Sequence, residues 1–137
     1  VQEEILRAIW NKFMLNVAIN QLSAILGATY RLFQTEEAAQ RLMRATMMEV
    51  VALAEAEGIN LHSEDVEPWF DIVATLGPDG KTSMLQDVEA ARKSEVEMFA
   101  GTVVALGERH NLATPLNRAI FDMIHLKEIM SGAVASA

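Results

Sequence analysis

The stretch "QEEILRAIWNKFMLNVAINQLSAIL", residues 2–26, predicts one long helix that ends near Gly27. Its second half is apolar on almost every side. Between Phe13 and Leu26 the polar side chains are Asn16, Asn20, Gln21 and Ser23. A helix that is apolar all round is usually buried on most sides. We therefore expect neighbouring helices to cover most of this part of the helix.

Lys12, Asn16 and Asn20 follow one another at intervals of four residues and so share one face of that helix. We call these three residues the polar stripe. Buried amides and ammonium groups are costly unless each finds a partner, so the stripe should face polar groups, a ligand or trapped water. A purely structural alternative stays open, in which the asparagines bond to a neighbouring loop and the lysine reaches solvent.

The rest of the chain also predicts helices, because strand patterns are nearly absent and the prolines and glycines fall between long helical patterns. Four more helices are expected at about 35–58, 63–72, 82–109 and 114–130, with Thr35, Ser63, Thr82 or Ser83, and Thr114 at their N-termini. The length of 137 residues and the hydrophobic fraction of 51% suit one domain, residues 1–137. The fold class is all-α, with about five main helices.

Composition excludes several classes of function. The net charge of −8 gives no basic field for nucleic acid, and Arg92 and Lys93 sit among acidic residues. The apolar runs are shorter than a membrane span and no signal peptide is found. The three histidines have no acidic partner at metal-binding spacing, so no metal site is expected. The absence of cysteine fits a cytoplasmic protein.

A second unusual segment is "KTSMLQDVEAARKSEVEMFAG", residues 81–101. Thr82 and Ser83 begin a helix, where hydroxyls and free N–H groups can receive a carboxylate. In one continuous helix, Glu95 would lie on roughly the same face about 18 Å further along. The alternative is that Ser83 is an N-cap followed by early-turn acids. The spacing alone does not choose between the two.

Two segments of the chain together resemble a known family. "WNKFMLNVAIN", residues 10–20, followed by "KTSMLQDVEAARKSEVEMFAGTVVALGERHNLATPLN", residues 81–117, closely resembles the C-terminal domain of ketopantoate reductases (2-dehydropantoate 2-reductases). The resemblance runs from Trp10 to about Ile124. It implies a multi-helix domain of the 6-phosphogluconate dehydrogenase C-terminal-like type. It also implies an NADP-dependent oxidoreductase that reduces 2-dehydropantoate to pantoate on the route to coenzyme A.

The resemblance also implies residue roles. Lys12 would donate a proton to the ketone oxygen, and a nearby ammonium would stabilise the negative charge that develops there. Asn16, Asn20 and Ser83 would bind the substrate, and Glu95 would lie near the nicotinamide end of NADPH and the lysine. Tyr30 stands about where some members have a further substrate-binding asparagine, so the particular 2-keto acid stays open.

The NADPH itself would be bound mainly by an N-terminal Rossmann domain, which the family has and this chain lacks, since no G-x-G-x-x-G follows a strand here. The chain begins with Val1 and enters a helix almost at once, so we expect it to be a piece of a longer polypeptide and to be inactive alone. The expected partners are that domain and a small 2-keto acid, and a homodimer is left open. The alternative is a non-catalytic helical interaction or dimerisation module, which would scatter the five side chains over the surface.

Overall fold

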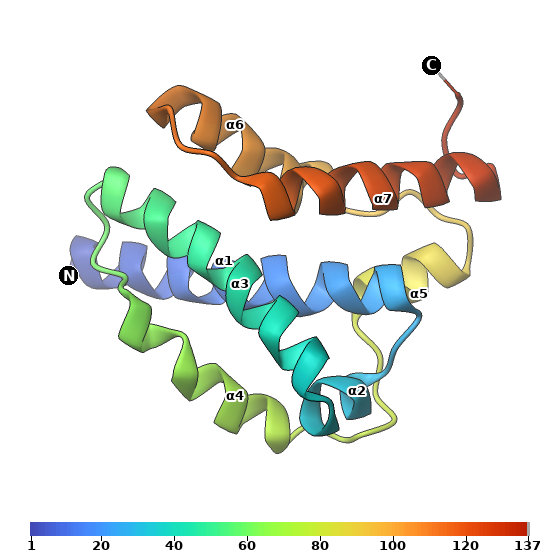
Figure 1. Ribbon diagram of the computed structural model, residues 1–137, viewed down its shortest axis with the longest axis horizontal. Helices are drawn as coiled ribbons and strands as arrows, with labels where there is room; N and C mark the ends of the chain where they lie inside the picture. The colour runs from blue at the N-terminus through green and yellow to red at the C-terminus, as the bar shows by residue number, and fades with distance from the viewer. Residues whose placement is uncertain (137) are drawn as a thin grey trace.

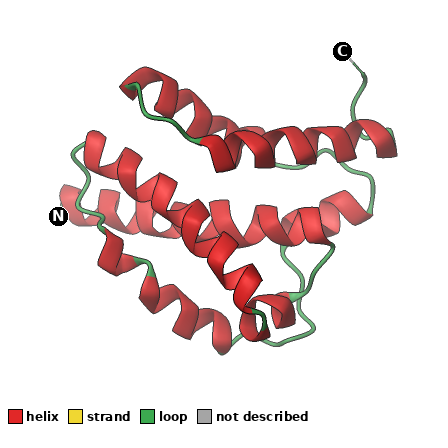
Figure 2. Cartoon of the chain, in the orientation of Figure 1, coloured by secondary structure: helices red, strands yellow, loops and turns green. Residues whose placement is uncertain are grey.

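The computed structural model describes residues 1–136, and in that part of the chain every regular element is helical (Figure 2). The all-α prediction is confirmed, although seven α-helices are present where about five were expected. They are α1 (Gln2–Leu26), α2 (Tyr30–Thr35), α3 (Glu37–Ala56), α4 (Glu67–Ala74), α5 (Ser83–Glu89), α6 (Thr102–His110) and α7 (Pro115–Ser131). A 3₁₀ turn, η1 (Ser63–Asp65), precedes α4, and a π-helical turn, η2 (Glu97–Gly101), precedes α6.

The long helix α1 runs through the middle of the fold and contacts α3, α5, α7 and η2 (Figure 1). Its side chains are buried from Met14 to Ala24 except at two positions, Asn16 and Asn20 of the stripe. It ends at Gly27, whose φ of 64° is a left-handed conformation that glycine adopts without strain. α6 and α7 lie together along one side of the α1–α3 pair, and α2 and α4 lie on the other (Figure 1).

Two predicted helix starts differ from the structure. Thr35 is the last residue of α2, a short helix that was not expected, and its hydroxyl donates to Arg31 O instead of capping α3. Ser63 is the first residue of η1, and His62 occupies the N-cap position. Thr82, in contrast, is the N-cap of α5, because its Oγ1 accepts from the N–H of Leu85 at 3.1 Å.

The single helix expected over 82–109 is broken. α5 ends at Glu89, Ala91 has a left-handed φ of 56°, and the chain is irregular until η2 begins. The prediction failed because two backbone N–H groups of this segment, those of Ser94 and Ala100, donate to side chains of α7 and α1. No local sequence pattern predicts hydrogen-bond acceptors that lie so far away in the sequence. Glu95 therefore does not share a helix with Ser83.

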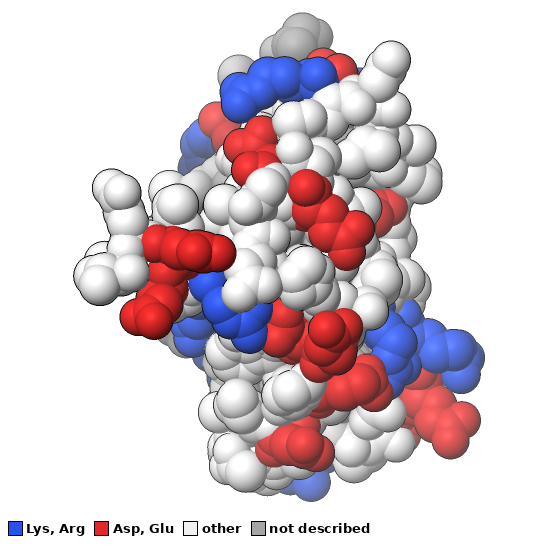
Figure 3. Space-filling view, turned by 90° about the vertical axis from the view of Figure 1, so that its left-hand side faces the viewer, with Lys and Arg blue, Asp and Glu red and all other residues white. Residues whose placement is uncertain are grey.

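The surface carries charges of both signs. On the face shown in Figure 3, acidic and basic side chains are interspersed among uncharged ones, without a continuous basic patch. Among residues 1–136, no helix combines the length and the apolar character that crossing a membrane would need.

Candidate functional site

The polar stripe lies along one wall of a pocket of about 160 Å³. Its three residues belong to α1, and the other walls come from α1 itself, α2 and the α4 region. Those walls consist of Leu15, Ile19, Tyr30, Trp69, Ile72, Val73 and Leu76. One helix therefore supplies an ammonium and two carboxamides, and the facing elements supply mainly apolar and aromatic surface.

The stripe occupies the open side of α1. Lys12 is exposed, and Asn16 and Asn20 are half-buried. Within residues 1–136, none of these three side chains forms a hydrogen bond to another protein group, so their donors and acceptors are available to a ligand. The asparagines do not bond to a neighbouring loop of the described chain, although the purely structural interpretation expected it, whereas Lys12 does reach solvent as it expected.

Trp69 shapes the pocket at the Lys12 end. The lysine Nζ lies 5.9 Å from the centroid of the Trp69 ring, which is within cation–π distance. The indole Nε1–H donates to Asn11 Oδ1 at 2.8 Å, and this bond fixes the ring against α1. The tryptophan therefore limits the directions in which the ammonium can point.

An ion pair attaches the start of the α4 region to α1. The Arg7 guanidinium binds the Asp65 carboxylate through two hydrogen bonds of 2.6 and 2.9 Å. These bonds hold the pKa of Asp65 below its ordinary value and raise that of Arg7, with the direct hydrogen bond as the largest cause in both cases. Asp65 also accepts from the N–H of His62, so the turn before α4 is fixed in place.

Tyr30 forms another part of the wall and is held by the loop before α5. Its N–H donates to Gly80 O at 3.0 Å, and the N–H of Arg31 donates to Pro78 O at 2.9 Å. A Cβ at position 80 would lie 3.0 Å from the Tyr30 ring, so glycine permits this close approach. The tyrosine thus lines the same pocket as the stripe, as its place in the sequence suggested.

Ser83 follows that loop but does not line the pocket. Its neighbour Thr82 shares a buried hydrogen bond of 2.7 Å with Ser23, and the Ser23 hydroxyl donates to Asn20 O at 2.9 Å. The backbone at Ser83 is therefore anchored to α1 next to the end of the stripe. Its side chain is exposed.

Glu95 is exposed and is also absent from the pocket lining. The segment that follows it packs on α1 through Phe99, whose ring centroid is 6.2 Å from that of Phe13, and through Ala100, whose N–H donates to Gln21. Phe13 and Gln21 each follow a stripe residue, so their face is turned by about 100° from the stripe. The structure thus brings Lys12, Asn16 and Asn20 together, and it anchors the segments of Ser83 and Glu95 on the two sides of α1.

The sequence did not reveal several polar residues that build this frame. Glu49 accepts hydrogen bonds from Leu116 N, Asn117 N and Asn117 Nδ2, which explains the asparagine after "TP" as a contact between α3 and α7. Gln21 was visible as an amide on an apolar helix, but its partner is a backbone group 79 residues away. Glu128, a buried acid on α7, gave no local signal at all.

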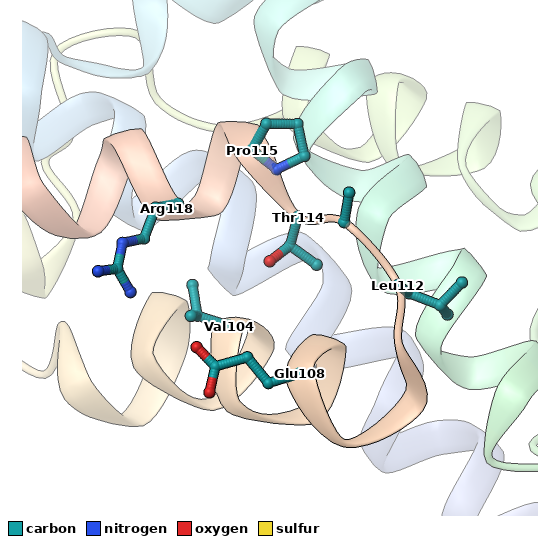
Figure 4. A pocket seen from close by; sticks show the side chains of 7 residues that line it. Val104, Glu108, Leu112, Thr114, Pro115 and Arg118 are labelled. Atoms are coloured by element: carbon teal, nitrogen blue, oxygen red, sulfur yellow. The ribbon is translucent and has the colours of Figure 1, made fainter.

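A larger hollow of about 380 Å³ lies at the start of α7, far along the chain from the stripe. Figure 4 shows Glu108 of α6 and Arg118 of α7 extending toward each other across it, with Thr114 and Pro115 to one side, where α7 begins. None of the predicted site residues lines this hollow. It carries no further argument about the stripe.

Comparison with known proteins identifies the family of the chain. Residues 4–128 match the family model described as "Ketopantoate reductase PanE/ApbA C terminal". The chain is 34% identical over 119 residues to 2-dehydropantoate 2-reductase of Pyrobaculum aerophilum, covering 87% of this chain and 42% of that protein. It is also 34% identical over 125 residues to the Vibrio cholerae protein of the same name, covering 91% of this chain and 42% of the relative.

Solved structures show the same likeness. The dimeric ketopantoate reductase of Staphylococcus aureus superposes with a TM-score of 0.85 at 26% identity, over 93% of this chain and 45% of that one. The chain spans about two fifths of the length of the curated relatives that it matches. The family model and the shared all-helical fold together show that the chain belongs to the ketopantoate reductase family, in which it corresponds to the C-terminal region.

Proposed function

We propose that this chain is the substrate-binding helical domain of an NADPH-dependent reductase that converts 2-dehydropantoate, or a related 2-keto acid, into the 2-hydroxy acid of pantothenate and coenzyme A biosynthesis. The observation that carries the proposal is the set of three stripe side chains, which share one pocket and form no internal hydrogen bonds in the described chain. Relatives of this chain are named 2-dehydropantoate 2-reductases, and this supports the choice of reaction.

Lys12 is the proposed proton donor. The cofactor, when bound, supplies a hydride to the ketone carbon, and negative charge develops on the ketone oxygen. An ammonium beside that oxygen stabilises the charge and then transfers a proton from Nζ, so that the ketone becomes a hydroxyl. The Trp69 ring, 5.9 Å from Nζ, keeps the lysine over the pocket while its charge stays accessible.

Asn16 and Asn20 are the proposed substrate contacts, with Ser83 from the neighbouring segment. Carboxamides and a hydroxyl suit a polar keto acid, because an analogue that leaves them unpaired loses affinity. The apolar surface of Ile72, Val73 and Leu76 on the far wall fits an aliphatic substrate side chain.

The chain offers only part of a cofactor site. Glu95 is exposed at the start of the segment that packs on α1, which suits a contact to the nicotinamide half of the cofactor. Residues 1–136 contain no strand, and so no strand-to-helix turn of the Rossmann type. The proposed full-length protein therefore supplies most of the cofactor contacts from an N-terminal Rossmann domain. A homodimer stays a prediction.

The rival function, a helical interaction module, has two observations in its favour. Ser83 and Glu95 are exposed and lie outside the pocket, as that function expects. Ile5, Leu6 and Ile9 on the N-terminal part of α1 are 54%, 44% and 58% exposed, so this part of α1 is an uncovered apolar surface. A reductase domain that packs against a second domain would present the same surface. The rival does not account for three polar side chains that converge on one pocket.

The test is keto-acid reduction by the full-length protein that carries this chain, with NADPH as the reductant. Lys12→Ala should lower kcat by about 100-fold or more, as the loss of a positioned proton donor does, while the far-UV spectrum is unchanged. Lys127→Ala, which removes a lysine from α7, is the matched control and should keep wild-type turnover. Near-normal turnover of Lys12→Ala would refute the assigned role, and a wild type that reduces no 2-keto acid would favour the rival.

A further inference from the structure

We propose that Gln21 and Glu128 are positioning residues that set the direction of the Glu95 side chain. This inference rests on the function proposed above, in which Glu95 contacts the cofactor. Neither residue lies in the pocket, and neither would touch substrate or cofactor. Each instead accepts a hydrogen bond from a backbone N–H of the segment that carries Glu95.

Gln21 changes the hydrogen-bond register of that segment. In a regular α-helix the N–H of Ala100 would donate to Val96 O, four residues earlier. It donates instead to Gln21 Oε1 at 2.9 Å, and Val96 O accepts from the N–H of Gly101 at 3.0 Å. One additional residue is thereby accommodated in the turn, which is the definition of a π-bulge. The glutamine of α1 is thus the physical cause of η2.

The bulge matters for Glu95 because each residue in an α-helix turns the chain by about 100°. The additional residue rotates everything before Gly101 by about that angle relative to α6. Without the bulge, the residues just before η2 would be turned by that angle, and the side chain at position 95 would point in a different direction. The exposed carboxylate of Glu95 therefore owes its orientation to an amide that is completely buried in the core.

Glu128 fixes the other end of the same segment. Its Oε2 accepts from the N–H of Ser94 at 2.5 Å, and Ser94 Oγ accepts from the N–H of Val96 at 3.3 Å. The residues on both sides of Glu95 are therefore held by buried groups, while its own side chain stays free. Glu128 is 2% exposed, and its Oε1 has no hydrogen-bond partner in the described chain.

Both residues are unfavourable choices for stability alone. Burying a carboxylate with one unpaired oxygen costs free energy, and an apolar residue fills a core position at lower cost. Gln21 also uses its Nε2 to donate to Val17 O at 2.7 Å, a group already engaged in the helix. A regular helix from Val96 onward with a leucine at position 21 would satisfy the same backbone groups. What the observed arrangement adds is a fixed, non-helical direction for Glu95.

The test is a double-mutant cycle in the full-length protein, with the Michaelis constant for NADPH as the readout. Gln21→Leu should raise this constant between about tenfold and 100-fold, which is the effect of losing one hydrogen bond to a charged group. The Michaelis constant for the keto acid should change little. Because Gln21 acts through Glu95, Gln21→Leu combined with Glu95→Gln should be no worse than Glu95→Gln alone.

Two further variants separate positioning from general destabilisation. Glu128→Gln keeps an oxygen that can accept from Ser94 and should retain the wild-type constant, whereas Glu128→Ala should raise it. Gln40→Leu removes another amide that donates to backbone carbonyls, those of Phe33 and Gln34, and should leave the constant unchanged. A crystal structure of Gln21→Leu should show the N–H of Ala100 bonded to Val96 O.

The inference would be overturned if Gln21→Leu and Glu95→Gln raised the Michaelis constant for NADPH by factors that multiply in the double variant. It would also be overturned if Gln21→Leu had the wild-type Michaelis constant for NADPH. If the wild type reduces a 2-keto acid, Lys12→Ala does not, and the cycle is multiplicative, only this inference fails. If the wild type reduces no 2-keto acid, the proposed function fails, and the inference fails with it.

Discussion

Replacing Glu49 with alanine should be among the most destabilising surface-accessible changes in this chain. Glu49 is half-buried on α3, and its carboxylate receives three hydrogen bonds from the first turn of α7 at 2.8–2.9 Å. Two come from the backbone N–H groups of Leu116 and Asn117, which have no partner inside the helix. The third comes from the Asn117 side chain. The α7 N-cap residue, Thr114, makes no side-chain capping bond, so Glu49 performs that task from another helix.

The magnitude follows from what each donor loses. Removing a capping acceptor costs about 1–2 kcal/mol. Leu116 is half-buried, so water can replace part of its hydrogen bond. Asn117 is completely buried, so its amide would remain unpaired, which costs about a further 1–3 kcal/mol. Together these losses lower the free energy of unfolding by about 3 kcal/mol. For a chain of this size the midpoint of thermal unfolding should fall by about 10 °C.

Urea denaturation followed by circular dichroism measures this free energy. Glu55→Ala, on the same helix, is the matched control, since its 57% exposed carboxylate lies 3.8 Å from one His62 nitrogen and should contribute less than about 0.5 kcal/mol. Glu49→Gln keeps one strong acceptor and should fall between wild type and Glu49→Ala. If Glu49→Ala stayed within about 0.5 kcal/mol of the wild type, the assignment of Glu49 as the cap of α7 would be wrong.

Two further predictions concern backbone strain and pH. Ala91→Gly should raise the free energy of unfolding by about 1 kcal/mol, because Ala91 has a φ of 56° and glycine adopts that conformation without a Cβ penalty; a lower urea midpoint for the variant would contradict this. The Arg7–Asp65 pair should make stability sensitive to acid. The pKa of Asp65 is lowered in the folded chain, so its contribution is fully present above the unfolded value of about 3.9 and is lost as pH falls through the lower folded value. Asp65→Asn should therefore show a shallower loss of stability below about pH 4 than the wild type, and equal acid sensitivity of the two would count against the pair.

The sequence by itself determined the helical class, the bounds of the long first helix and the polar stripe. These depend on local rules: apolar residues recur at helical spacing, Gly27 ends α1 with a positive φ, and residues four apart share a face. The same local rules placed Lys12, Asn16 and Asn20 together before any contact was known. The resemblance to ketopantoate reductases also depended on linear motifs, and the family match confirms it.

Tertiary structure alone decided which surfaces face that stripe and where the fourth predicted helix breaks. Trp69 and Tyr30 reach the pocket because Arg7 and Gly80 fix their segments against α1 and α2, and contacts over such sequence distances leave no periodic pattern. Glu95 does not share a helix face with Ser83, because Gln21 and Glu128 accept hydrogen bonds from backbone N–H groups that would donate within a regular helix. Local propensity describes each segment alone. A hydrogen bond from a backbone N–H to a buried side chain that is distant in sequence forms only once the core has assembled.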